Sequence, residues 1–360
     1  MKILLIFTGG TIGSAMKNGY IGTDNKQQSM LLSMFQNYAE YVDSTMKDVE
    51  FDTISPYTIL SENMDLAHLR QLSLCIREHI ENYDGIIITH GTDTLQYTAA
   101  GLSYLFAGVQ FPIMLVSSNY ILEDEKANGF ANFVAAVSFI QKKRGTGVFT
   151  TYQNNYTHTG VNHLAPVYIH RGNRMHAHEV FTDAVFSIND SYHGYYDVRE
   201  TENGHIYHDY HEKVQHQVQP DTIHTLAENP FYQALENEWN ATKILSLECK
   251  PDMWLPSLTK EINGILIKAY HSGTLPMDTD GFQSFCEQAK TLQIPMFIAG
   301  NTLVSDENIA QYESTNSFTA YQLQILPKTS TVALYMKLLL ITALKLDTKI
   351  LTQCVGEDLL

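Results

Sequence analysis

Cysteine and basic residues are scarce in this chain of 360 residues, and both shortages limit what it can be. The four cysteines lie far apart and form no CxxC pair, which argues against a structural zinc site and a disulfide framework. There are 23 lysines and arginines against 39 aspartates and glutamates, and the net charge is −16. Because nucleic acid and anionic membranes are bound by basic patches, we expect neither as a partner.

Long hydrophobic runs are also missing. The most apolar stretch, MKLLLITALKLDTKI, is interrupted by lysines and does not qualify as a membrane span. The N-terminal MKILLIFTGG lacks the longer apolar region and the cleavage site of a signal peptide. We therefore expect a cytoplasmic protein whose thiols are reduced.

What the chain does contain is an alternation of short apolar runs and helical patterns. The runs end in glycine and polar turns and are typical of buried strands; they are KILLIF (2–7), GIIIT (85–89), PIMLV (112–116) and GVFTTY (147–152). Helical patterns lie between them, at 64–80, 94–108 and 127–143. This order predicts an α/β fold with a mostly parallel sheet flanked by helices.

The length favours two domains, at roughly 100–200 residues per domain. We expect an N-terminal α/β domain over residues 1–190, which carries the catalytic threonines proposed below. Residues 191–240 are predicted to form a hairpin, with its turn at ENG, followed by a linker. Strand and helix patterns resume after residue 241, so residues 241–360 are expected to form a second, smaller α/β domain.

Three polar turns follow the predicted strands: TGGT (8–11), HGTDT (90–94) and SSNY (117–120). Ligands of parallel sheets bind beyond the carboxyl ends of the strands, so the turns predict a site at that edge. Each turn also has a local explanation, since Thr11 could cap a turn or helix and Asp93 could be the N-cap of the next helix. As a nucleophile, Thr11 would need a neighbouring base.

Together, TGGTI and HGTDT resemble the two threonine signatures of the bacterial-type asparaginase/glutaminase family, in its type I (cytoplasmic) branch. The resemblance covers nearly the whole chain and is strongest in the first 135 residues; it includes GYIG (19–22), LSENMD (60–65), PIMLVSSNY (112–120), ANGFANFVAA (127–136) and RGNR (171–174). It implies hydrolysis of the side-chain amide of L-asparagine to L-aspartate and ammonia, through an acyl-enzyme. It also implies no cofactor, no metal, a small amino-acid substrate, and a homodimer or homotetramer.

The resemblance assigns catalytic roles residue by residue. Thr11, helped by Tyr20, would attack the amide carbon. Thr92 and Asp93 would belong to a second polar group that acts as a base or positions water. Main-chain N–H groups near Thr92 and Ser118 would hold the oxyanion.

Substrate contacts follow from the same resemblance. Gly10 and Gly91 lie in the two threonine turns, and Ser61 and Glu62 lie in a loop similar to the family's serine-containing substrate loop. The ammonium group of the substrate would meet the carboxylates of Asp93 and Glu62.

The chain departs from the family after RGNR, where the family has a lysine in a pattern such as RGNRxxK. Here Ala177 takes that position, and a shift of one residue brings in His176 or His178, which could relay a proton near neutral pH or be ordinary polar residues. Lys126 is another candidate, with a solvated surface lysine as the plain alternative. Asn128 stands where the family more often has aspartate. We therefore keep three alternatives: a non-catalytic amino-acid binder, an enzyme that acts on a different amide, and an amidase subunit of a larger complex.

Two further sets of residues are weaker candidates. The hairpin segment GHIYHDYHEK carries His205, His208 and His211, but this spacing on a strand alternates faces and does not gather three metal ligands. We expect an exposed polar segment there rather than a metal site. Asp306, in the second predicted domain, corresponds to an acidic residue that approaches the site in the family.

Overall fold

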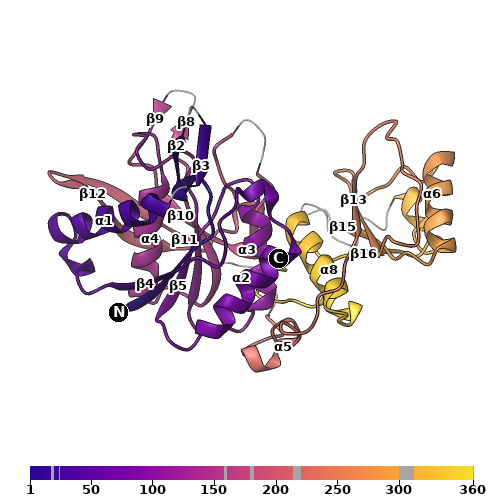
Figure 1. Cartoon of the computed structure of the whole chain (residues 1–360). Helices are drawn as coiled ribbons and strands as arrows, with labels where there is room; N and C mark the ends of the chain where they lie inside the picture. Colours follow the sequence, from indigo (N-terminus) through magenta and orange to yellow (C-terminus); the bar gives the residue numbers. More distant parts are fainter. Residues whose placement is uncertain are drawn as a thin grey trace. The chain divides into compact units, whose positions relative to one another are not determined.

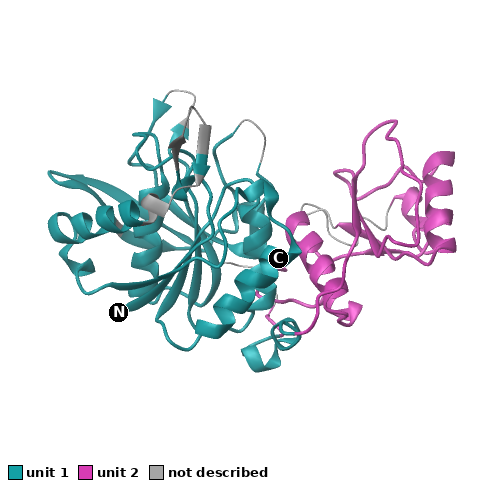
Figure 2. Ribbon diagram, viewed as in Figure 1, with its two compact units in different colours: residues 1–216, 223–236 teal, residues 217–222, 237–360 magenta. Residues whose placement is uncertain are grey.

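The computed structural model describes residues 1–17, 20–23, 25–157, 160–178, 182–213, 220–299 and 312–359. The chain forms two compact units: unit 1 comprises residues 1–216 and 223–236, and unit 2 comprises residues 217–222 and 237–360 (Figure 2). The strands of unit 1 are β1 (Lys2–Phe7), β2 (Ser14–Lys17), β3 (Tyr20–Thr23), β4 (Glu50–Ile54), β5 (Gly85–Thr89), β6 (Pro112–Val116), β7 (Gly147–Gln153), β8 (Tyr156–Thr157), β9 (Gly160–Val161), β10 (Val167–Arg171), β11 (Gly194–Thr201) and β12 (Gly204–Glu212). Its α-helices are α1 (Asn25–Tyr41), α2 (Leu66–His79), α3 (Leu95–Leu105), α4 (Gly129–Gln141) and α5 (Pro230–Gln233).

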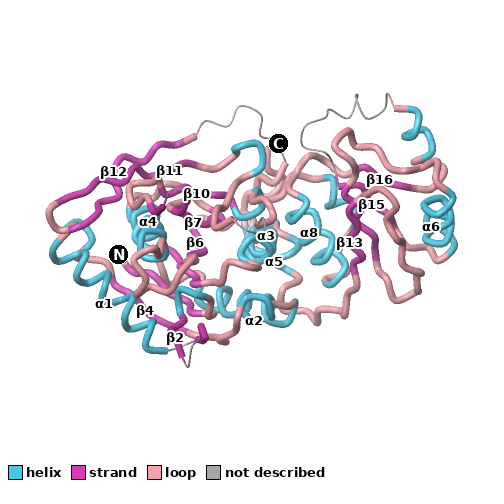
Figure 3. The backbone as a smooth tube through the Cα atoms, turned by 90° about the horizontal axis from the view of Figure 1, so that it is seen from above, coloured by secondary structure: helices cyan, strands magenta, loops and turns pink. Residues whose placement is uncertain are grey.

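An eight-stranded sheet forms the centre of unit 1, with the order β12-β11-β10-β7-β6-β5-β1-β4 (Figure 1). The five neighbouring strands β7, β6, β5, β1 and β4 are parallel. β10, β11 and β12 extend the sheet by antiparallel pairing. From above, the strands from β12 to β6 follow one another across the unit (Figure 3). The prediction of a mostly parallel sheet is confirmed.

Burial on both faces explains the apolar runs of the central strands. All five residues of β5 and of β6 are buried, as central strands of a parallel sheet require. Alternate residues such as Ile3, Ile87 and Met114 join α1 and α4 in one hydrophobic core. The intervening residues point to the opposite face, and α2 and α3 pack against each other.

The predicted hairpin is present as β11 and β12. The two strands pair antiparallel up to Thr201 and Gly204, so the turn contains Glu202 and Asn203 of the ENG motif. The hairpin continues the large sheet, because β11 pairs with β10. Its inward residues Tyr196 and Val198 belong to the core under α4.

Unit 2 has a parallel sheet of four strands in the order β13-β14-β15-β16. Its elements are β13 (Ile244–Glu248), β14 (Gly264–Lys268), α6 (Asp280–Thr291), β15 (Met296–Ala299), β16 (Leu323–Ile325) and α8 (Thr331–Ala343). Ile265, Ile267 and Phe282 lie in its hydrophobic core. The second, smaller α/β part is therefore confirmed. Within the described residues, no helix is both long enough and apolar enough to cross a membrane.

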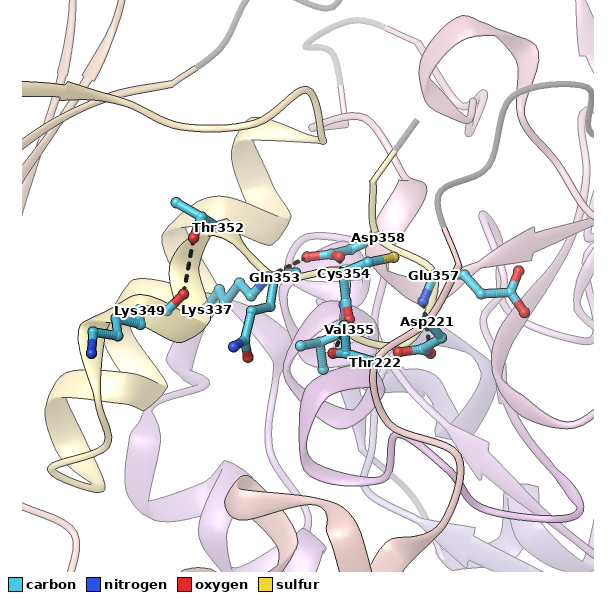
Figure 4. A network of polar contacts seen from close by, with 10 residues as sticks. All are labelled: Asp221, Thr222, Lys337, Lys349, Thr352, Gln353, Cys354, Val355, Glu357 and Asp358. Atoms are coloured by element: carbon cyan, nitrogen blue, oxygen red, sulfur yellow. Dashed lines mark hydrogen bonds and ion pairs between the residues drawn. The ribbon is translucent and has the colours of Figure 1, made fainter.

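A buried ion pair fixes the C-terminal segment of unit 2 (Figure 4). The Lys337 Nζ in α8 lies 2.8 Å from Asp358 Oδ2, and both side chains are fully buried. Lys337 Nζ also donates to the Gln353 carbonyl at 2.6 Å, and Val355 N donates to Asp358 Oδ1 at 2.9 Å. Thr222 Oγ1 donates to the Cys354 carbonyl at 2.6 Å. This hydrogen bond joins the short first segment of unit 2, residues 217–222, to its C-terminal segment.

Candidate active site

The turn after β1 can form because it contains two glycines. Gly9 and Gly10 have φ angles of 113° and 77°, which side chains disfavour. A Cβ atom on Gly9 would lie 2.1 Å from the Ile59 carbonyl oxygen, so the turn also needs glycine to approach the loop before Ser61. Thr8 Oγ1 donates to the Thr89 carbonyl at 2.6 Å, which joins the ends of β1 and β5.

The turns TGGT and HGTDT are in direct backbone contact. A Cβ on Gly10 would lie only 2.3 Å from the nitrogen of Gly91. A Cβ on Gly91 would lie 2.3 Å from Ser61 Oγ. The structure therefore brings Gly10, Gly91 and Ser61 together, although they come from three separate parts of the chain.

Thr11 is the first residue of a 3₁₀ turn over Thr11–Gly13 and is partly buried. The residue at the N-cap is Gly10, so the interpretation of Thr11 as a cap is wrong. Ser14 Oγ donates to the Gly10 carbonyl at 2.8 Å and holds the turn from inside. Tyr20 begins β3 and pairs with Lys17, and its side chain lies outside the described part of the structure.

His90 supports the second turn from the interior. Its side chain is buried, and Nδ1 lies 2.8 Å from the Gly91 carbonyl oxygen. Because a carbonyl can only accept, Nδ1 carries the proton and donates. Burial lowers the pKa of His90, which keeps the ring neutral. A neutral His90 fixes the Gly91 peptide while Thr92, two residues on, stays partly exposed.

Asp93 is exposed and does not cap α3. Thr94 occupies the N-cap position and makes no side-chain cap bond, so the N-cap interpretation of Asp93 is wrong. Instead, Ser61 Oγ donates to Asp93 Oδ2 at 3.4 Å, and Thr94 Oγ1 donates to the Ser61 carbonyl at 2.8 Å. Glu62 directly follows Ser61 in the chain and is exposed. No role was predicted for Thr94, although its place inside the HGTDT motif could have indicated one.

The turn Ser117–Tyr120 begins beside HGTDT, because His90 N donates to the Val116 carbonyl at 2.9 Å. Ser118 is fully buried. Its hydroxyl donates to the Tyr120 carbonyl at 2.5 Å and accepts from Gly129 N at 3.1 Å. The hydroxyl is thus used inside the protein, and a contact of Ser118 with substrate would be made by its main chain.

The turns TGGT, HGTDT and Ser117–Tyr120, all rich in hydroxyl side chains, lie together at the ends of neighbouring strands. All three lie in the part of the chain that matches known proteins. The family model "Asparaginase, N-terminal" matches residues 2–209, more than half of the chain. The chain belongs to the asparaginase family. The match covers all three turns and the loop with Ser61.

Two curated relatives of this asparaginase-family chain cover part of it. L-asparaginase 1 of Escherichia coli K12 is 30% identical over 162 residues, which are 44% of this chain and 46% of that protein. One subunit of the glutamyl-tRNA(Gln) amidotransferase of Methanosarcina barkeri is 33% identical over 138 residues, 38% of this chain and 30% of that protein. The chain therefore spans less than half of either relative.

One solved structure extends the likeness in fold to the whole chain. The thermostable L-asparaginase of Thermococcus kodakarensis superposes with a TM-score of 0.72, covering 100% of this chain and 99% of that one. Its sequence identity is 18%, so this likeness concerns the fold alone.

In this asparaginase-family chain, the segment directly after RGNR carries no lysine. His176 is exposed, and its main-chain nitrogen donates to the Phe186 carbonyl at 2.9 Å. His178 Nε2 lies 3.0 Å from the Thr182 carbonyl, a contact within its own loop. Ala177 between them is exposed. A proton-relay role for His176 stays a prediction.

Lys126 is exposed, and its ammonium lies 5.6 Å from the centre of the Tyr120 ring. This cation–π contact places Lys126 beside the turn Ser117–Tyr120, at a distance typical of such pairs. Its exposure fits the plain alternative of a solvated surface lysine, and a catalytic role for Lys126 stays a prediction.

The histidine-rich hairpin forms other contacts. His211 Nε2 lies 2.8 Å from Asp197 Oδ2, and the ring of His205 stacks on that of His163. Over the part of the chain that the structure describes, no group of three or more His, Cys, Asp or Glu could hold a metal ion. The side chain of His208, and all of Asp306, lie outside that part.

Proposed function

We propose that this chain is an amidohydrolase that cleaves the side-chain amide of L-asparagine to L-aspartate and ammonia. The observation that supports this most is the backbone contact between Gly10 and Gly91, which holds the two threonine turns against each other. Membership of the asparaginase family and the similarity to the L-asparaginase 1 of Escherichia coli support the substrate. We further propose a cytoplasmic homodimer or homotetramer that needs no cofactor.

In the proposed reaction, Thr11 Oγ attacks the amide carbon of the substrate, and Tyr20 takes part in removing its proton. Ammonia leaves and the aspartyl group stays as an ester on Thr11. Water then attacks this ester, positioned by Thr92 and Asp93, and releases aspartate. Main-chain N–H groups near Thr92 and Ser118 stabilise the oxyanion in both steps.

The substrate's α-ammonium is proposed to lie between Glu62 and Asp93. Both carboxylates are exposed at the Ser61 loop and the HGTDT turn, and Ser61 donates to Asp93. A hydrogen bond between charged groups is about twice as strong as a neutral one, so this pair can select amides with a free amino group.

Ammonia release from L-asparagine, L-glutamine and short amides by the full chain tests the proposal. The wild type should release ammonia from L-asparagine. Thr11→Ala should lose at least about 10³-fold in rate, as removal of a nucleophile does, and Thr92→Ala about 10²–10⁴-fold. Thr201→Ala is a matched control, since this hydroxyl bonds the Gly204 carbonyl in the hairpin turn.

The acyl-enzyme has a separate signature. With hydroxylamine present, the ester on Thr11 should be diverted to aspartyl hydroxamate, and Thr11→Ala should form none. Ammonia release without hydroxamate would contradict the acyl-enzyme intermediate, but it would still support amide hydrolysis. No release from any amide, with substrate still bound, would instead favour the non-catalytic binder.

A glutaminase that supplies ammonia to a partner is a second candidate. The match to a component of a glutamyl-tRNA(Gln) amidotransferase, at 33% identity over 138 residues, favours it over other amidase classes. A higher kcat/KM for L-glutamine than for L-asparagine would support this second candidate.

A further inference from the structure

Behind the turn Ser117–Tyr120 lies a group of asparagines whose amides are bonded largely to main chain. We call Asn119, Asn128, Asn132 and Asn155 the asparagine cluster. Asn132 Nδ2 donates to the Ser117 carbonyl at 2.9 Å and fixes the start of the turn. Because the turn begins beside HGTDT, whatever fixes its main chain also fixes one wall of the candidate site.

Asn119 and Asn128 bind each other's main chain. Asn119 N donates to Asn128 Oδ1 at 2.9 Å, and Asn128 N donates to Asn119 Oδ1 at 3.0 Å. Tyr120 N also donates to Asn119 Oδ1, at 3.0 Å. The two side chains therefore close the loop between them at both ends.

Asn128 ties this loop to the end of β7. Its side chain is fully buried, and Nδ2 donates to the carbonyl of Gln153, the last residue of β7, at 2.8 Å. A second link runs through Asn155, whose Oδ1 accepts from Asn119 Nδ2 at 3.2 Å and whose Nδ2 donates to the Lys126 carbonyl at 3.0 Å. With one buried side chain, Asn128 thus bonds both the turn and the end of β7.

We propose that Asn128 is a positioning residue that sets the main chain of Ser117–Tyr120 for substrate binding and oxyanion stabilisation. This inference rests on the proposed function. Asn128 needs an oxygen that accepts from Asn119 N and a nitrogen that donates to the Gln153 carbonyl, and a primary amide supplies both.

Asn128→Ala tests this role in the full chain, because it removes the side-chain bonds to Asn119 N and the Gln153 carbonyl. Because a misplacement of about 1 Å can cost about 10²-fold in rate, kcat/KM for L-asparagine should fall about 10–100-fold.

Asn229→Ala is the matched control for stability. Asn229 is equally buried, and its Nδ2 donates to the carbonyls of Tyr104 and Ala107 at 2.9 and 3.0 Å. Asn229→Ala should lower the melting temperature as Asn128→Ala does, while kcat/KM stays at the wild-type value below that temperature. Equal losses of kcat/KM in both variants would overturn the proposal.

Hydrogen exchange of the amides of residues 117–121 gives a readout that does not depend on activity. In folded Asn128→Ala these amides should exchange faster than in Asn229→Ala. Unchanged exchange, or wild-type kcat/KM in folded Asn128→Ala, would refute the role of Asn128. If the wild type released no ammonia at all, the proposed function would fail, and the exchange rates would still decide whether Asn128 sets this turn.

Discussion

Replacing Gly10 by alanine should separate the two threonine turns. The added Cβ would lie 2.3 Å from Gly91 N and 2.5 Å from the His90 carbonyl carbon, and both neighbours are backbone. Backbone cannot rotate away as a flexible side chain can, so the turns themselves must move apart. Gly10 also has φ 77° and ψ 175°, a region that is almost restricted to glycine.

The magnitude follows from these two terms. An L-residue in this region of φ and ψ costs about 1–3 kcal/mol, and overpacking costs about 1–3 kcal/mol more. If the fold stayed unchanged, stability would fall by roughly 2–6 kcal/mol, out of the 5–15 kcal/mol typical of a folded protein. If the turns separate instead, part of this stability is regained, and a misplacement of about 1 Å lowers the rate by about 10²-fold.

Gly13→Ala is the matched control in the same turn. A Cβ built on Gly13 meets nothing within 4 Å, so this variant should keep wild-type melting and ammonia release. Thermal melting and kcat/KM for L-asparagine are measured for Gly10→Ala, Gly13→Ala and wild type. Gly10→Ala with both values unchanged would refute the contact between the turns as the basis of the site.

Other parts of the molecule allow three more predictions. Lys337→Met removes the ammonium that pairs with the buried Asp358 carboxylate, and it should lower the free energy of unfolding in urea by about 3–5 kcal/mol. The double variant Lys337→Met/Asp358→Leu should regain part of this loss, and no regain would contradict the uncompensated carboxylate as its cause. Burial lowers the pKa of His170 to about 3, well below the unfolded value near 6.5, so stability should fall as pH drops below about 6.5, by up to about 1.4 kcal/mol per pH unit. Melting of His170→Gln between pH 6.5 and 4 should fall less steeply than wild type, and equal slopes would exclude His170 as a source. Ser61→Ala should raise KM more than it lowers kcat, because Ser61 orients Asp93; an unchanged KM would remove that role.

Strands buried on both faces were predictable to the residue. β1, β5 and β6 coincide with the apolar runs, because no solvent-facing position interrupts them. β4, EFDTI, was missed since it lies at the edge of the sheet and most of its residues keep some exposure. The α1 helix was missed as well, because its sequence NKQQSMLLSMFQNYAEY mixes polar residues closely with its apolar face.

The site was predictable only where it is local. TGGT and HGTDT follow from glycines and hydroxyls within a few residues of a strand end. The contact of Gly10 with Gly91 joins residues far apart in the chain, which no local pattern encodes. Local rules also misplaced the caps, because α3 begins at Leu95 and leaves Asp93 free to accept from Ser61.

The order in which the units occupy the chain has a consequence for synthesis on the ribosome. Residues 223–236 belong to unit 1 and follow a first piece of unit 2. Within them, Asn229 bonds the carbonyls at the end of α3, 125 residues earlier for Tyr104, and Phe231 packs on the Tyr104 ring. Since chains emerge N-terminus first, the end of α3 lacks the hydrogen bonds from the Asn229 amide until Asn229 has emerged. A nascent chain that ends after β12 therefore contains every strand of the large sheet but not yet the segment that bonds the end of α3.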